Sequence, residues 1–117
     1  AASVKHSALV GRVAEFFESY DFLLCPAAQV PPFSLDDEWV SSINGIELPT
    51  YLDWMGVCWA ITVTGCPAIS VPAGFTPDGL PIGIQIVGRR GHDLDVLRVA
   101  RAFEQATGFA ARRPALD

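Results

Sequence analysis

Basic residues are scarce in this sequence, and lysine is nearly absent. Its 117 residues contain eight Lys and Arg against 13 Asp and Glu, a formal net charge of −5 at pH 7. Nucleic-acid-binding surfaces are clustered basic faces, whereas the pairs Arg89-Arg90 and Arg112-Arg113 are isolated here. The composition therefore excludes a nucleic-acid partner, and both pairs are interpreted as solvated surface.

Long hydrophobic runs are also missing, although the chain is rich in apolar residues. Apolar residues make up 50% of the sequence and charged residues 18%, against ~25% charged residues in soluble domains. No run reaches the roughly 18 to 20 apolar residues that a membrane span requires, so no membrane partner is expected. The surplus indicates apolar surface that another subunit, or a further part of a longer polypeptide, covers.

The N-terminus and the cysteines bear on where the chain resides. No basic patch precedes an apolar block, so no signal peptide is predicted. The chain opens on Ala1-Ala2 and its single methionine is Met55, so residue 1 is expected to be a processed or excised end. Three cysteines, Cys25, Cys58 and Cys66, are an odd number for a secreted disulfide framework. A reducing, cytoplasmic location is therefore predicted.

The first half of the chain is predicted to hold two helices and one strand. Apolar residues three and four apart indicate a helix over residues 3–20, and FLLCP at 22–26 suits a buried strand. The chain from 27 to 49 is expected to be irregular. A second helix is predicted over 51–61, with Thr50 as its cap.

The second half is predicted to hold a hairpin and a helix. AISVPAG at 68–74 and PIGIQIVG at 81–88 are typical of strands, and the turn residues between them predict a wide loop. A last helix is expected to begin at the cap Asp93 and end at Gly108. Its inward side chains are predicted to be Val96, Leu97, Ala100 and Phe103. The fold class is therefore α/β, with sheet strands that include a hairpin and three flanking helices.

Prolines and glycines interrupt this second half at positions with distinct structural meanings. Gly65 and Pro67 are expected to set the bend between the second helix and the hairpin. Pro72 lacks a backbone donor and predicts a sheet edge or an irregularity. Gly83 and Gly88 predict places where another element packs closely against a strand.

Side chains that could carry catalysis are present, but the spacing does not arrange them in a set. Cysteine and histidine could form a nucleophile and base, yet nothing positions Cys25 or Cys58 against a histidine. Cys58 and Cys66 are eight residues apart and lack the close pairs of a zinc site. Ser70 lies in a predicted apolar strand that does not present it to solvent, and its pairing with Lys5 stays open. No catalytic residue, metal or cofactor is predicted within this chain.

A double motif resembles the C-terminal region of the amidase signature family, which includes the A subunits of glutamyl-tRNA amidotransferases. TVTGCPAISVPAG at 62–74 and GLPIGIQIVGRR at 79–90 match family patterns like N-x-x-G-x-P-A-x-S-V-P-x-G and G-L-P-x-G-x-Q-x-[IV]-G. FLLCPAAQVPPF upstream and HDLDVLRVARAFEQATG downstream extend the resemblance over nearly the whole chain. The family often has Asn where this chain has Thr62, which replaces an amide with a hydroxyl. The resemblance implies that 1–117 is a single C-terminal segment of an amidase domain, without the N-terminal and central catalytic part. Its strands are then expected to belong to a large mixed β-sheet.

The resemblance also implies a function that this chain does not complete alone. Family members hydrolyse or transfer amides through a Ser–cis-Ser–Lys triad. The Gly/Ser-rich segment that bears both serines is absent here, and Lys5 lacks the family's lysine context. We therefore expect the C-terminal portion of an amidohydrolase, inactive alone, that supplies scaffold and part of the acyl pocket. At ~25 cal/mol per Å² of apolar area, its uncovered strands would favour self-association by several kcal/mol.

The helix before the double motif lines the acyl side of the substrate pocket in the family. The corresponding positions here are Leu52, Met55, Trp59 and Thr62. The amidotransferase A subunits have an aspartate at the Met55 position, which suits a substrate ammonium group and which methionine does not replace. A bulky apolar or aromatic amide is therefore expected rather than glutamine. The alternative is that this apolar stripe is ordinary core, as such faces usually are.

Two other functions stay open on the sequence. The apolar surplus also fits a non-catalytic binding or oligomerisation module that reuses the fold, which should form one symmetric oligomer. A separately encoded subunit of a split enzyme is the other alternative, which the missing initiator methionine disfavours. The physiological amide of the intact protein is not specified by any of these residues, nor is the choice between hydrolysis of the amide and transfer of its amide group.

Overall fold

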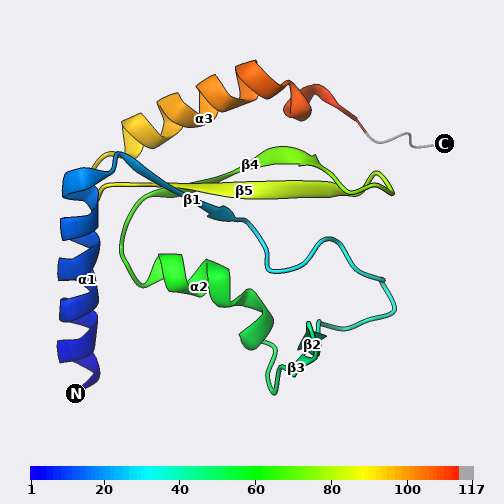
Figure 1. The fold of residues 1–117 in the computed structure, drawn as a ribbon, viewed down its shortest axis with the longest axis horizontal. Coiled ribbons are helices and arrows are strands. Elements are labelled where there is room, and N and C mark those ends of the chain that lie inside the picture. Colours follow the sequence, from blue (N-terminus) through cyan, green and yellow to red (C-terminus); the bar gives the residue numbers. More distant parts are fainter. Residues whose placement is uncertain (114–117) are drawn as a thin grey trace.

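A three-stranded antiparallel sheet forms the centre of the computed structural model, which describes residues 1–113 (Figure 1). The strands are β1 (Phe22–Pro26), β4 (Ala68–Phe75) and β5 (Pro81–Gly88). β5 is the middle strand and pairs with β1 on one side and β4 on the other. The predicted hairpin is confirmed, and so is a strand at 22–26. Its predicted burial is wrong, because β1 lies at the sheet edge and its residues are half-buried or exposed.

Residues 1–113 also contain the three predicted α-helices, α1 (Ala2–Ser19), α2 (Gly56–Thr62) and α3 (Asp93–Thr107). Short 3-10 turns precede α2 and follow α3, as η1 (Asp53–Met55) and η2 (Phe109–Ala111). The long irregular stretch holds a small hairpin of β2 (Ser42–Ile43) and β3 (Ile46–Glu47). Asn44 and Gly45 turn this hairpin with φ of 50° and 78°, the left-handed backbone that these two residue types tolerate best.

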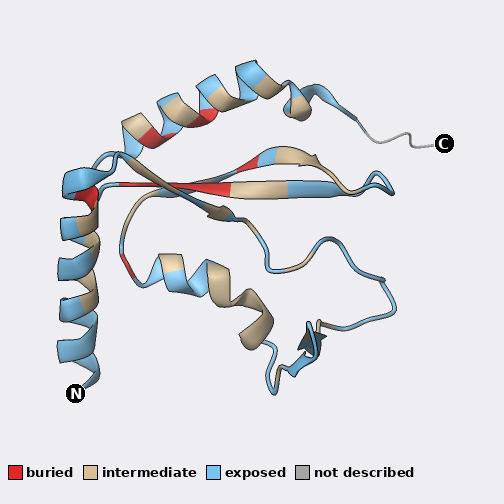
Figure 2. Cartoon of the chain, in the orientation of Figure 1, coloured by how far each residue is buried: buried red, intermediate tan, exposed pale blue. Residues whose placement is uncertain are grey.

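The core lies between the sheet and α3, which covers one sheet face (Figures 1 and 2). Val71 of β4, Ile86 of β5 and Ala100 of α3 form its centre. Partly buried side chains surround them: Phe22, Ile69, Ile84, Val99 and Phe103. These strand residues alternate along each strand, so one face of the sheet provides them all.

Two predictions about α3 are wrong. Leu97 is 56% exposed rather than inward, whereas Val96 and Ala100 are buried. A helix lying on a single sheet buries a narrow stripe, and Leu97 is turned about 100° away from Val96 around the helix axis. The cap position is held by His92, and Asp93 is already the first helical residue. The predicted end at Gly108 is confirmed by its left-handed φ of 67°.

The opposite sheet face is covered only in part. Phe17 of α1 is buried, and a cavity of about 250 Å³ is lined by Phe17, Leu23, Ile61 and Val87, residues of α1, α2 and two strands. Toward β4 the cover ends, and Ser70 is exposed. The prediction that Ser70 is hidden from solvent is therefore wrong, because β4 is an edge strand with no helix over this side.

Backbone irregularities occur where the prolines and glycines predict them. β4 is an edge strand, and its register with β5 shifts between Pro72 and Gly74. A Cβ on Gly83 would lie 3.1 Å from the Cβ of Ala27, so the chain after β1 packs closely there. Gly65, in the turn between α2 and β4, has a φ of +68°.

The chain is flat and open. Its principal extents are 50 × 39 × 19 Å, and its radius of gyration is 16.5 Å, against about 13 Å for a compact domain of this length. Many large apolar side chains are exposed, including Val4, Tyr20, Leu24, Leu35, Leu52 and Trp59. The expected uncovered apolar surface is therefore present.

Candidate functional site

The segment predicted as one helix over 51–61 is divided in two. η1 ends at Met55 and α2 begins at Gly56. Thr50 does not cap a helix with its hydroxyl oxygen. Instead its backbone N–H and its hydroxyl both donate to Oδ2 of Asp53, at 2.8 and 2.7 Å. The carboxylate of Asp53 thus orders the turn that Thr50 was expected to cap.

The structure brings together two of the four predicted pocket residues. The indole N–H of Trp59 donates to the carbonyl of Leu52 at 3.0 Å, and both side chains are more than half exposed. Met55, which lies between them in the sequence, is half-buried. Thr62 is exposed and its hydroxyl donates to the carbonyl of Cys58 at 3.1 Å, a bond within its own helix. Leu52 and Trp59 therefore do not pack as core within this chain.

Side chains from elsewhere hold the start of α2. Oε1 of Gln29 accepts the backbone N–H of Val57 at 2.9 Å, which satisfies one of the free donors of a helix N-terminus. Nε2 of Gln85 donates to the carbonyls of Pro26 at 3.1 Å and Val57 at 3.4 Å. Sequence reasoning assigned no role to either glutamine, although Gln85 is the glutamine of the GLPIGIQIVG motif.

The end of α2 is held from two further directions. Nε2 of His6 lies 2.7 Å from the carbonyl oxygen of Val63, and Nη2 of Arg90 donates to the carbonyl of Thr64 at 2.9 Å. The Arg90 guanidinium also fills the space beside Gly65, where a Cβ would meet Nη2 at 2.6 Å. Carbonyls at a helix C-terminus lack partners in their own helix, so α1 and the residues after β5 stabilise this turn.

Aromatic rings join the irregular stretch to η1. The ring of Trp54 meets the rings of Phe33 and Tyr51 edge to face, at centroid distances of 5.5 and 6.0 Å. The indole N–H of Trp54 is buried and has no acceptor among the described residues. This contact places the loop after β1 against the segment that leads into α2.

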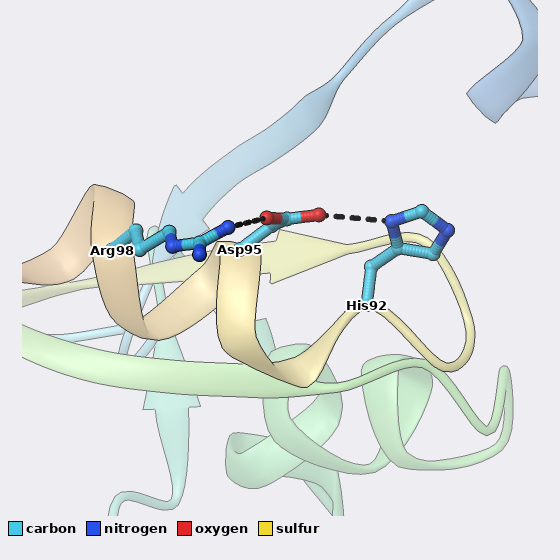
Figure 3. Close-up of polar contacts among 3 residues, drawn as sticks. All are labelled: His92, Asp95 and Arg98. Carbon is cyan, nitrogen blue, oxygen red and sulfur yellow. Dashed lines mark hydrogen bonds and ion pairs between the residues drawn. The ribbon is translucent and has the colours of Figure 1, made fainter.

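A separate polar cluster lies at the start of α3 (Figure 3). Asp95 accepts a hydrogen bond from Nδ1 of His92 at 2.9 Å and from Nη1 of Arg98 at 3.0 Å. These two bonds, that of His92 first, hold the pKa of the Asp95 carboxyl below its ordinary value. The cluster lines a cleft of about 410 Å³ with Tyr20 and Arg89. All three side chains are about half exposed or more, as in a surface ion network at a helix start.

No catalytic set is assembled within residues 1–113. His6 contacts a backbone carbonyl and His92 an aspartate, so neither histidine pairs with a cysteine there. The same residues hold no group of three potential metal ligands. Over this range no hydrogen bond joins Ser70 to Lys5. None of the described helices is long and apolar enough to cross a bilayer.

Known proteins match this chain in sequence and in fold. Residues 1–97 match the Amidase family model. The A subunit of the glutamyl-tRNA(Gln) amidotransferase of Brevibacillus brevis is 39% identical over 99 residues, which are 84% of this chain and 19% of that protein. This chain therefore spans about a fifth of the length of the curated relatives it matches.

Solved structures give the same result. A bacterial aryl acylamidase of the amidase signature enzymes superposes with a TM-score of 0.78 and 34% identity, over 93% of this chain and 24% of that one. A 6-aminohexanoate cyclic dimer hydrolase superposes with a TM-score of 0.76 and 28% identity, over 94% and 24%. The family model, the relatives and the shared fold all agree with the double motif of β4 and β5: this chain belongs to the amidase signature family and corresponds to its C-terminal region.

Proposed function

We propose that this chain is the non-catalytic C-terminal portion of an amidohydrolase that converts a carboxylic amide into an acid and ammonia or an amine. The observation that carries the proposal is that family relatives match this chain almost throughout, yet are about five times longer. The chain itself holds no Gly/Ser-rich segment that could present two serines. The Ser–cis-Ser–Lys triad then belongs to the part of the parent protein outside these 117 residues.

Within that enzyme the chain supplies scaffold and one wall of the acyl pocket. Leu52 and Trp59 support this role because they are exposed and joined by a hydrogen bond, next to the half-buried Met55. The four proposed pocket side chains carry two hydrogen-bonding groups, the indole N–H of Trp59 and the hydroxyl of Thr62. The indole N–H is bonded to the carbonyl of Leu52, and the hydroxyl is bonded within α2. Such a wall has no charge to offer a substrate ammonium group and favours apolar contact.

The proposed substrate is accordingly a bulky apolar or aromatic amide. The aryl acylamidase among the structural relatives supports this choice by its name and its 34% identity. A glutamine substrate would need a partner for its ammonium group, and the four pocket positions supply none. We place the intact enzyme in the cytoplasm, in keeping with the three free cysteines.

Substrate selectivity of the intact enzyme tests the pocket. Trp59→Ala should lower kcat/KM for an aryl amide about 10- to 200-fold, as loss of apolar pocket contacts does, and affect a small amide far less. Met55→Asp should lower aryl-amide turnover in the same selective way, because a carboxylate in an apolar wall must be desolvated. Leu94→Ala, an exposed leucine on α3, is the matched control and should leave both rates unchanged. Equal losses on both substrates, or no loss, would contradict the pocket assignment.

A binding or oligomerisation module is the second candidate, and the open shape with exposed apolar side chains favours it. Light scattering across a dilution series separates the two. An uncovered amidase face should give heterogeneous, concentration-dependent self-association, since no symmetric contact defines its end point. One discrete symmetric oligomer at all concentrations would favour the module.

A further inference from the structure

Two cysteines that the proposed function does not use lie where α2 approaches β1. Cys25 is half-buried in β1, Cys58 is exposed in α2, and both are free thiols. Side chains alternate along a strand, so Cys25 points to the same sheet face as Leu23. Leu23 lines a cavity together with Ile61 of α2. Cys25 therefore faces the helix that carries Cys58.

The thiol of Cys58 reaches back to the chain just beyond Cys25. Its Sγ donates to the carbonyl oxygen of Ala27 at 3.4 Å, and Ala27 is two residues after Cys25 in sequence. The hydrogen bond is weak, because a thiol is a poor donor. A rotation of the Cys58 side chain away from that carbonyl therefore costs little.

Gln85 joins the backbone on both sides of the pair. It is the register partner of Cys25 across the sheet, and its Nε2 donates to the carbonyls of Pro26 at 3.1 Å and Val57 at 3.4 Å. Pro26 directly follows Cys25, and Val57 directly precedes Cys58. One side chain thus holds the two cysteine-bearing segments at a fixed separation.

The two thiols differ in environment. Burial raises the pKa of Cys25, and the charge of a nearby Cys58 thiolate raises it further. The exposed Cys58 is accordingly the thiol that reacts first with a reagent from solvent, and the half-buried Cys25 is the thiol that reacts second. This is the arrangement of an attacking cysteine beside a resolving cysteine.

We propose that Cys25 and Cys58 are a redox-modification site that forms a reversible intrachain disulfide with glutathione disulfide as oxidant. The Cys58 thiolate attacks one sulfur of glutathione disulfide, breaks its S–S bond and releases one glutathione thiolate. The Cys25 thiolate then attacks the Cys58 sulfur of the mixed disulfide and releases the second. The protein dithiol loses two electrons and two protons, and the oxidant becomes two glutathione molecules.

The disulfide would fasten α2 to β1 at the first turn of the helix that carries Trp59. Oxidation would then restrain a wall of the acyl pocket, and a reductant would release it. This consequence rests on the proposed function, whereas formation of the disulfide does not. A test on the 117-residue chain therefore separates the two.

Cleavage at the single methionine detects the link directly. Cyanogen bromide cuts after Met55, which separates Cys25 from both Cys58 and Cys66. The chain is equilibrated in glutathione redox buffers, quenched in acid, cleaved and weighed by mass spectrometry without reduction. The two fragments should stay joined in oxidised samples of the chain and of Cys66→Ser. They should separate in Cys25→Ser and Cys58→Ser.

Comparison with the unfolded chain tests whether the fold aligns the pair. The equilibrium constant for disulfide formation in buffer should exceed that in concentrated urea by at least about tenfold, about 1.4 kcal/mol. Equal constants in buffer and urea, a link that requires Cys66, or a product that stops at glutathione on Cys58 would each overturn the proposal. A Cys25–Cys58 link that forms as expected, beside an intact enzyme whose Trp59→Ala variant keeps its selectivity for aryl amides, would instead count against the proposed function alone.

Discussion

The side chain of Val96 occupies the space beside Gly88 in which a Cβ would have to lie. Gly88 ends β5 and Val96 stands in the first turns of α3, so this contact sets how closely the helix lies on the sheet. The ring of Phe22 in β1 and the carbonyl oxygen of His92 would lie 3.7 and 3.8 Å from that Cβ. Three elements therefore meet at one glycine, and the packing of α3 on the sheet requires that Gly88 has no side chain.

Gly88→Ala should destabilise the chain by about 1–3 kcal/mol, because the added methyl overpacks a tight contact. Urea denaturation followed by circular dichroism measures the free energy of unfolding. In a Val96→Ala background the same substitution should cost much less, since the methyl groups it meets are gone. Equal costs in both backgrounds would show that the two residues are not coupled.

Gly11→Ala is the matched control for that series. Gly11 lies inside α1, and a Cβ there would have nothing within 4 Å. The substitution should stabilise the chain by up to about 1 kcal/mol, the difference in helix propensity between the two residues. A loss of stability at Gly11 would mean that α1 is packed differently.

Arg90→Ala should loosen the turn between α2 and β4. It removes the donor to the carbonyl of Thr64. The loss should cost about 1.5 kcal/mol, the low end for a hydrogen bond to a charged group, because Arg90 is exposed. Arg89→Ala is the neighbouring control, since no side-chain hydrogen bond of Arg89 is found within residues 1–113 and its carbonyl, which accepts from the N–H of His92, is kept. Hydrogen exchange of the amides from 63 to 66 should increase in the first variant and stay unchanged in the second.

Asp95→Asn should lower the thermal midpoint at neutral pH and have no effect in acid. The pKa of Asp95 is lowered in the folded chain by the bonds from His92 and Arg98. The ionised carboxylate therefore contributes stability above its unfolded pKa, and this contribution is lost as the pH falls through the folded pKa. Asp21 and Arg89 line the same cleft, so Asp21→Asn serves as a control. A midpoint difference that persists at the acid end would contradict the assignment.

Periodicity predicted the sheet, its hairpin and all three helices, because each is a local pattern of apolar residues. The edge position of Pro72 and the close packing at Gly88 were also predictable from single residues, because proline lacks a backbone donor and glycine lacks a side chain. The division at Met55 and Gly56 was not, because it depends on the carboxylate of Asp53 capturing Thr50. The exposure of Leu97 depends on how much of α3 one sheet can cover.

Within the candidate site, the sequence placed Leu52 and Trp59 on one face, and the indole bond between them agrees. It missed Gln29, Gln85 and Arg90, which hold α2 from distant parts of the chain. Such bonds join residues 26 to 28 positions apart in sequence, so no local pattern reports them. Their role as supports of the pocket depends on the pocket assignment, and that assignment stays a prediction.

Amide hydrolysis by the chain alone and by the intact enzyme tests the central claim most directly. Each is incubated with an aryl amide, and the released amine or ammonia is measured against buffer. We predict turnover by the intact enzyme and no release above buffer by the 117-residue chain, because we propose that the triad lies outside it. Turnover by the chain alone, retained in a Lys5→Ala, Ser70→Ala double variant, would contradict this claim.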